Sequence, residues 1–101
     1  MSGANPARGE AAFLVDGTSV VLRPSFEALV AAEEELGPLF ALVERAAGGG
    51  LKLSEVVALF WHCQRDRKAE RERIGAAIVE AGLARATPVL RILLSQILQG
   101  R

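Results

Sequence analysis

The sequence predicts a mainly α domain with a small β element, an α+β fold in which an N-terminal two-stranded β-hairpin precedes four to five short helices. Three observations indicate this class. Two short runs rich in Val, Leu and Phe flank the dipeptide Asp16-Gly17, which favours a tight hairpin turn. Beyond residue 24, apolar residues recur at helical spacing. Glycines, prolines and capping residues divide that stretch into short segments.

The hairpin is expected at residues 10–23, because Asp and Gly both tolerate the positive φ of a two-residue type I′ turn. A lone two-stranded hairpin is only marginally stable in water, so it must pack on the helices or gain a partner strand. Residues 1–9 are expected to form a flexible N-terminal lead-in. Residues 10–101 are expected to form a single domain, whose helical part spans 25–99.

Each helical segment carries an apolar face and a start or stop signal. The expected segments lie at about 26–36, 39–47, 55–63, 74–81 and 88–99. Ser25 is placed to cap the first segment, Ser54 the third and Thr87 the last, where Pro88 takes the first helical position. The third segment is apolar nearly all round, so we expect it to be the central helix.

Charge and composition argue against several classes of function. Twelve basic and twelve acidic residues cancel, so no net field attracts the chain to nucleic acid or to anionic lipid. No run of about 18 apolar residues is present that would span a membrane. The single cysteine, Cys63, rules out an internal disulfide and fits a reducing cytoplasm, which is the expected location.

No pattern indicates an enzyme, a metal site or a cofactor. His62 and Cys63 are adjacent, but neighbouring helical positions project about 100° apart, and the sequence has no second His or Cys. The glycine triplet 48–50 follows a helix and lacks the strand that a phosphate loop requires. The run 65–73 interleaves both charge signs without aromatics, which favours a solvated segment over a nucleic-acid patch. We therefore expect no catalytic, metal or cofactor residues.

Glu33 is a charged residue within the apolar stripe of the first helix. On a helical wheel it falls about 20° from Phe26, near the middle of that stripe. An unpaired carboxylate in a core would be costly, so Arg23 or Arg45 is the expected partner. One interpretation is an inward ion pair that fixes the hairpin on the first helix. The alternative is that the stripe is a docking groove, with Glu33 meeting a basic group of a partner.

Several short motifs occur through most of the chain. They are N-P-x-R-G-E at 5–10, V-D-G at 15–17, L-R-P-S-F-E-A-L at 22–29, E-x-x-L-G at 33–37 and A-G-L at 81–83. This order of motifs resembles the small phage-tail proteins encoded in gene transfer agents and related prophages, over about Asn5 to Gly100. The candidate partner-binding or structural residues that follow from these patterns are Arg8, Glu10, Arg23, Phe26, Leu29 and Glu33.

The resemblance implies non-enzymatic work in tail assembly. The family has been labelled a tail tube protein, and in size it is similar to the tail assembly chaperones of long-tailed phages. Such chaperones bind the tape-measure protein and help to recruit tail tube subunits. We therefore expect a chaperone whose partners are the tape-measure protein and the tail tube protein, with self-association into a homo-oligomer left open.

Two alternatives remain. The first is a structural tail tube subunit that is retained in the particle, although such subunits normally form rings through a large β-sheet. The second is a small helical regulatory or nucleic-acid-binding protein, which would need a recognition helix with exposed basic residues.

Overall fold

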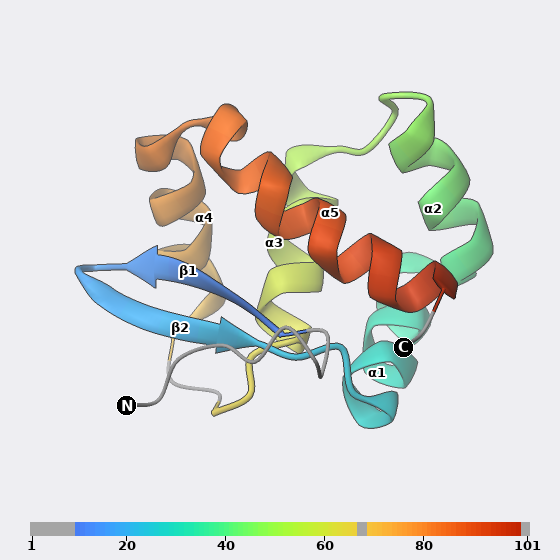
Figure 1. The fold of residues 1–101 in the computed structure, drawn as a ribbon, viewed down its shortest axis with the longest axis horizontal. Coiled ribbons are helices and arrows are strands. Elements are labelled where there is room, and N and C mark those ends of the chain that lie inside the picture. Colours follow the sequence, from blue (N-terminus) through green and yellow to red (C-terminus); the bar gives the residue numbers. More distant parts are fainter. Residues whose placement is uncertain (1–9, 67–68, 100–101) are drawn as a thin grey trace.

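The computed structural model describes residues 10–66 and 69–99, and these contain a β-hairpin followed by five helices (Figure 1). The elements are β1 (Ala11–Val15), β2 (Thr18–Leu22), α1 (Phe26–Leu36), α2 (Leu39–Ala47), α3 (Leu53–His62), α4 (Arg71–Ala81) and α5 (Leu83–Gln99). The predicted fold class is confirmed. In the view of Figure 1, α5 crosses in front of α3, with the hairpin and α4 on the left and α2 on the right. The predicted lead-in at 1–9 lies outside the described residues.

The hairpin forms as its turn signal predicts. β1 and β2 pair antiparallel, with Phe13 opposite Val20, and the turn residues Asp16 and Gly17 have φ of 53° and 78°. Along β1, alternate residues are buried, because successive side chains point to opposite faces of the sheet. The rings of Phe13 and of Phe60 on α3 pack edge to face, with 5.5 Å between the ring centroids. The hairpin is therefore stabilised by packing on the helices.

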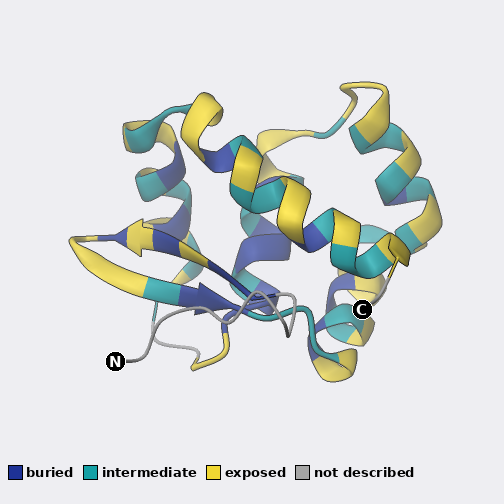
Figure 2. Ribbon diagram, in the orientation of Figure 1, coloured by how far each residue is buried: buried dark blue, intermediate teal, exposed yellow. Residues whose placement is uncertain are grey.

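The third helix is central, as its sequence predicts. Leu59 and Phe60 of α3 are fully buried, and they join a core to which both strands and all the other helices contribute. Figure 2 shows buried residues gathered on α3 and on the neighbouring part of the hairpin. The segment that follows α3 bonds to the outer edge of β2, which fixes the hairpin relative to the core.

Three helix starts differ from the predictions. α4 begins at Arg71, inside the charged run, rather than near residue 74. α3 begins at Leu53, and the carboxylate of Glu55 accepts the backbone N–H of Lys52, so Ser54 lies inside the helix and does not cap it. α5 begins at Leu83, because the chain turns at once after α4 through a glycine with positive φ, and Pro88 therefore lies inside the helix. The hydroxyl of the preceding threonine donates to a helical carbonyl and caps nothing.

α1 packs against the core through the side of the helix that lies opposite Phe26 and Val30. Its buried residues are Ala28 and Ala32, which let its backbone approach α3 closely. Phe26 is 84% exposed and Val30 41% exposed. On a helical wheel the two alanines lie roughly opposite this pair, because each residue advances about 100°. Two other residues of the stripe, Leu29 and Leu36, are partly buried against the core. Only the side that carries Phe26 and Val30 faces outward, and the docking interpretation applies to that side.

Candidate functional site

The described residues offer little of the chemistry that an active site needs. No group of three His, Cys, Asp or Glu in this part of the chain is placed to hold a metal ion. None of the helices described is both long enough and apolar enough to cross a membrane. Burial raises the pKa of the Cys63 thiol to about 12, so the group stays a protonated thiol at neutral pH and is a poor nucleophile.

A polar cluster joins three helices around Glu35 of α1. Arg71 of α4 donates to both oxygens of this carboxylate, at 2.6 and 2.9 Å, and Nε2 of His62 on α3 lies 2.8 Å from it. The hydrogen bonds from Arg71, and then the one from His62, lower the pKa of Glu35 to about 2. Because the carboxylate is ionised, Nε2 is the donor. The Arg71 guanidinium also lies 4.6 Å from the centre of the Trp61 ring. The cluster stabilises the packing of α1, α3 and α4.

A second charged cluster contains two of the residues that the sequence motifs single out. Glu10 is buried, with one carboxylate oxygen 3.8 Å from Nε of Arg23 and the other 3.7 Å from a guanidinium nitrogen of Arg65. Glu10 and Arg23 therefore act in the structure itself, where they hold the start of the hairpin against the segment after α3. Arg8, also singled out by the motifs, lies outside the described residues.

Glu33 makes a different contact from the expected ion pair. Its side chain is exposed, and Oε2 accepts the backbone N–H of Leu39 at 3.0 Å, at the N-terminus of α2. A carboxylate is favourable there because the first N–H groups of a helix are unsatisfied and carry partial positive charge. Arg23 and Arg45 pair with other glutamates. The predicted pairing of Glu33 is therefore wrong, since its side chain is exposed and needs no cation to offset burial.

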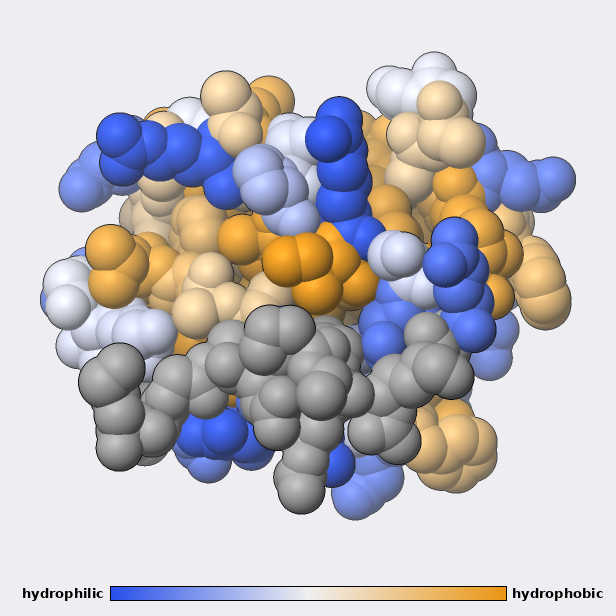
Figure 3. Space-filling view, viewed as in Figure 1, coloured by the Kyte–Doolittle hydropathy of each residue, from blue (hydrophilic) through white to orange (hydrophobic). Residues whose placement is uncertain are grey.

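Exposed and partly buried apolar residues form, together with Glu33, a surface that we call the α1–α2 face. Its members are Phe26, Leu29, Val30 and Glu33 of α1, Leu39, Phe40 and Val43 of α2, and Ile97 and Leu98 of α5. All but Phe26 and Val30 line a groove of about 220 Å³ between the three helices. Phe40 is 82% exposed. Figure 3 shows apolar surface over α5 at the centre of the view and over α2 at its right.

Three of the six candidate residues from the sequence come together on this face. They are Phe26, Leu29 and Glu33, whereas Glu10 and Arg23 belong to the second charged cluster. Sequence reasoning did not include Phe40 among its candidates. The signal that would have found it is its place at the start of a short helix, beside the Gly37-Pro38 break.

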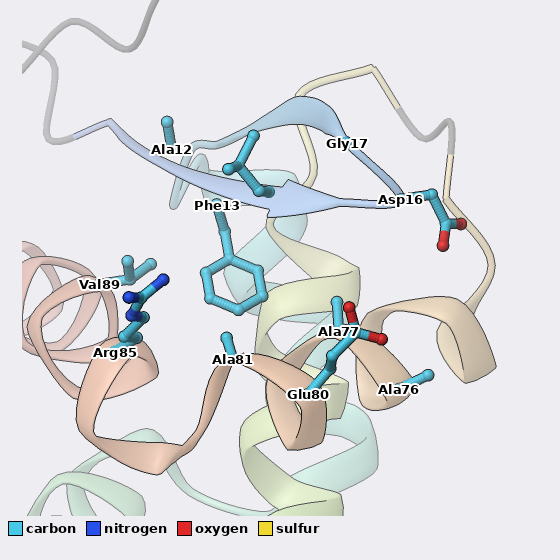
Figure 4. A pocket seen from close by; sticks show the side chains of 11 residues that line it. Ala12, Phe13, Asp16, Gly17, Ala76, Ala77, Glu80, Ala81, Arg85 and Val89 are labelled. Carbon is cyan, nitrogen blue, oxygen red and sulfur yellow. The ribbon is translucent and has the colours of Figure 1, made fainter.

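A larger cavity of about 450 Å³ lies between β1, α4 and the start of α5 (Figure 4). The Phe13 ring points from the strand towards Ala81, and Arg85 and Val89 border the cavity from α5. Its lining is a mixture of alanines and separated charges, with Glu80 pointing from α4. No base, acid and nucleophile converge there, so this cavity indicates no reaction.

Comparison with known proteins identifies a family. Residues 8–100 match the family model described as "Phage tail tube protein, GTA-gp10", which covers nearly the whole chain. No curated protein and no solved structure matches the chain. The resemblance to tail proteins of gene transfer agents is confirmed. The description fits the alternative of a structural tail tube subunit better than it fits the expected chaperone. The chain belongs to the family of phage tail tube proteins described as GTA-gp10.

Proposed function

We propose that this chain works without catalysis in forming the tail of a phage-like particle, by binding another tail protein through the α1–α2 face. The observation that carries the proposal is the outward apolar stripe of α1, which continues into the groove beside Phe40. Removing apolar surface from water contributes about 25 cal/mol of favourable free energy for each Å² that is buried, so an exposed apolar face favours binding. Contiguous surface of this kind marks a site of interaction in soluble proteins.

The first candidate role is a structural tail tube subunit that stays in the particle. The family description supports it. A ring of identical subunits requires a head-to-tail contact in which one surface of each copy meets a different surface of the next. The α1–α2 face would supply one of these two surfaces, and self-association into a homo-oligomer follows from this role.

The second candidate role is an assembly chaperone that binds the tape-measure protein in the host cytoplasm. The observation that favours it is the small sheet. Each strand has five residues, and within the described residues the sheet has two strands, which is little for a ring held together by sheet edges. A groove between helices instead suits an amphipathic helix of a partner. The tape-measure protein is the expected owner of that helix.

Two measurements on the same system separate the roles. Quantitative mass spectrometry of purified particles gives the copy number of the chain relative to the major tail protein. Co-expression of the tagged chain with the tape-measure protein, followed by pull-down, tests for direct binding and for a gain in solubility. A ring-like copy number supports the subunit. Absence from particles together with a soluble complex supports the chaperone. If the chain is absent from particles and binds neither the tape-measure protein nor the major tail protein, the proposed function is contradicted altogether.

A further inference from the structure

The α1–α2 face lies in an acidic part of a chain that has no net charge. Residues 24–44 contain five glutamates and no lysine or arginine, whereas the whole chain has twelve residues of each sign. Glu35 is neutralised by its contacts with Arg71 and His62. The other four carboxylates are exposed, and no ion pair joins them to another side chain in the part of the chain that the structure describes. They are Glu27, Glu33, Glu34 and Glu44.

Three of these glutamates border the apolar stripe of α1. Positions three and four apart are neighbours on a helix surface. Glu27 lies three residues before Val30 and Glu34 four residues after it, so both stand along one side of the stripe. Glu33 lies four residues after Leu29 and lines the groove. The apolar surface therefore carries negative charge along one border and beside its groove.

We propose that the α1–α2 face binds an amphipathic helix whose apolar stripe is flanked by lysines and arginines; this rests on the proposed function and names its partner chemistry. The groove between α1, α2 and α5 receives the apolar side chains of that helix. The bordering glutamates receive its basic side chains. Complementary charge of this kind speeds association and fixes the orientation of the docked helix.

Other occupants fit the charge less well. A symmetric contact between two copies would place the same surface on itself, and the glutamates would then face one another. Nucleic acid and anionic lipid are repelled by exposed carboxylates. A neighbouring groove of about 340 Å³, between the end of α2, α3 and α5, is lined by Arg91 and by no carboxylate. A basic helix is therefore expected to select the α1–α2 face over this second groove.

A pair of synthetic peptides tests the proposal. Each has about 18 residues, enough for about five helical turns, with one leucine stripe flanked either by lysines or by glutamates. Each peptide is titrated into the isotope-labelled full chain, and NMR gives both the affinity and the residues whose signals shift on binding. The lysine peptide is expected to bind about tenfold or more tightly than the glutamate peptide, to shift residues of the α1–α2 face and to weaken as salt rises.

Charge-reversed variants locate the binding. Glu27→Lys together with Glu34→Lys is expected to lower the affinity for the lysine peptide about tenfold, since both side chains are exposed and border the stripe. The matched control, Glu72→Lys with Glu80→Lys on α4, makes the same change of charge away from the face and should keep the affinity within about twofold. Phe40→Ser removes an exposed ring and leaves the core intact, so it tests the groove independently of charge.

Each outcome decides the proposal. Equal affinity for the two peptides, equal losses in the test and control variants, or shifts confined to another surface would overturn it. If these results appear while the chain still co-purifies with a tail protein, the non-catalytic role in forming the tail stands and only the assignment of binding to the α1–α2 face falls. If the lysine peptide binds as expected but no tail protein does, the proposed function falls and the binding chemistry of the face stands.

Discussion

Replacing Glu35 with glutamine should lower the free energy of unfolding by about 1–2 kcal/mol at pH 7. The carboxylate accepts two hydrogen bonds from Arg71 and one from His62, and glutamine keeps one acceptor oxygen and no charge. The drop in the pKa of Glu35 from 4.5 to about 2 sets an upper bound of about 3 kcal/mol through linkage. Because 39% of this side chain is exposed, solvent screening reduces the contribution from that bound to about 1–2 kcal/mol.

The effect of Glu35 has a definite sign with pH. Its pKa is lower in the folded chain than in the unfolded chain, so its stabilisation is complete above about pH 4.5. The stabilisation decreases as pH falls below that value and is lost by about pH 2, where the folded chain also binds the proton. Glutamine does not titrate. The difference between the wild type and Glu35→Gln should therefore shrink between about pH 4.5 and pH 2.

Urea titrations at several pH values measure this directly. The fluorescence of Trp61, the single tryptophan of the chain, reports on unfolding, and circular dichroism gives an independent probe. Glu34→Gln is the matched control, because Glu34 is the exposed neighbour and should change stability by less than about 0.5 kcal/mol. If Glu35→Gln behaves like this control at pH 7, or if its cost stays constant down to pH 2, the Glu35 cluster does not stabilise the fold as described.

Three further predictions concern the core and the turns. Phe60→Ala should cost about 3–5 kcal/mol in a urea titration, because its fully buried ring leaves a cavity, and a loss below about 1 kcal/mol would mean that α3 is not central. Cys63 should react with a thiol reagent at pH 8 only as fast as the fold opens, so immediate labelling of the native chain would contradict its burial and its raised pKa. Gly82→Ala should cost about 1 kcal/mol or more in thermal unfolding, since its φ is 94°, whereas Gly48→Ala, with negative φ, should cost less than half as much.

Local signals made the hairpin and the order of the helices predictable. The turn residues Asp16 and Gly17 need no distant partner to favour their conformation. A helix that is apolar nearly all round, such as α3, is stable only when it is buried in the core. The start of α5 was missed because the proline rule gives only a preference. Here the positive φ of Gly82 allows the helix to start at Leu83, five residues before Pro88, which was expected at the first helical position.

The side of α1 that faces the core was not predictable from its pattern. The largest apolar residues of this helix favour one side, but close packing on α3 selects the side that carries Ala28 and Ala32. The partners of Glu35 lie 27 and 36 residues further along the chain, so local sequence gives no sign of that cluster. The motifs made Phe26 and Glu33 candidates without indicating their surroundings, and the structure places both outside the core.

Photo-crosslinking during particle production tests whether the α1–α2 face contacts another tail protein. A photoreactive analogue of phenylalanine replaces Phe40 on the α1–α2 face, and the same analogue at Val79 on α4, which is also exposed, serves as the control. We expect a crosslink from position 40 to another tail protein and none of comparable yield from position 79. No crosslink from position 40, or equal yields of the same product from both positions, would contradict it.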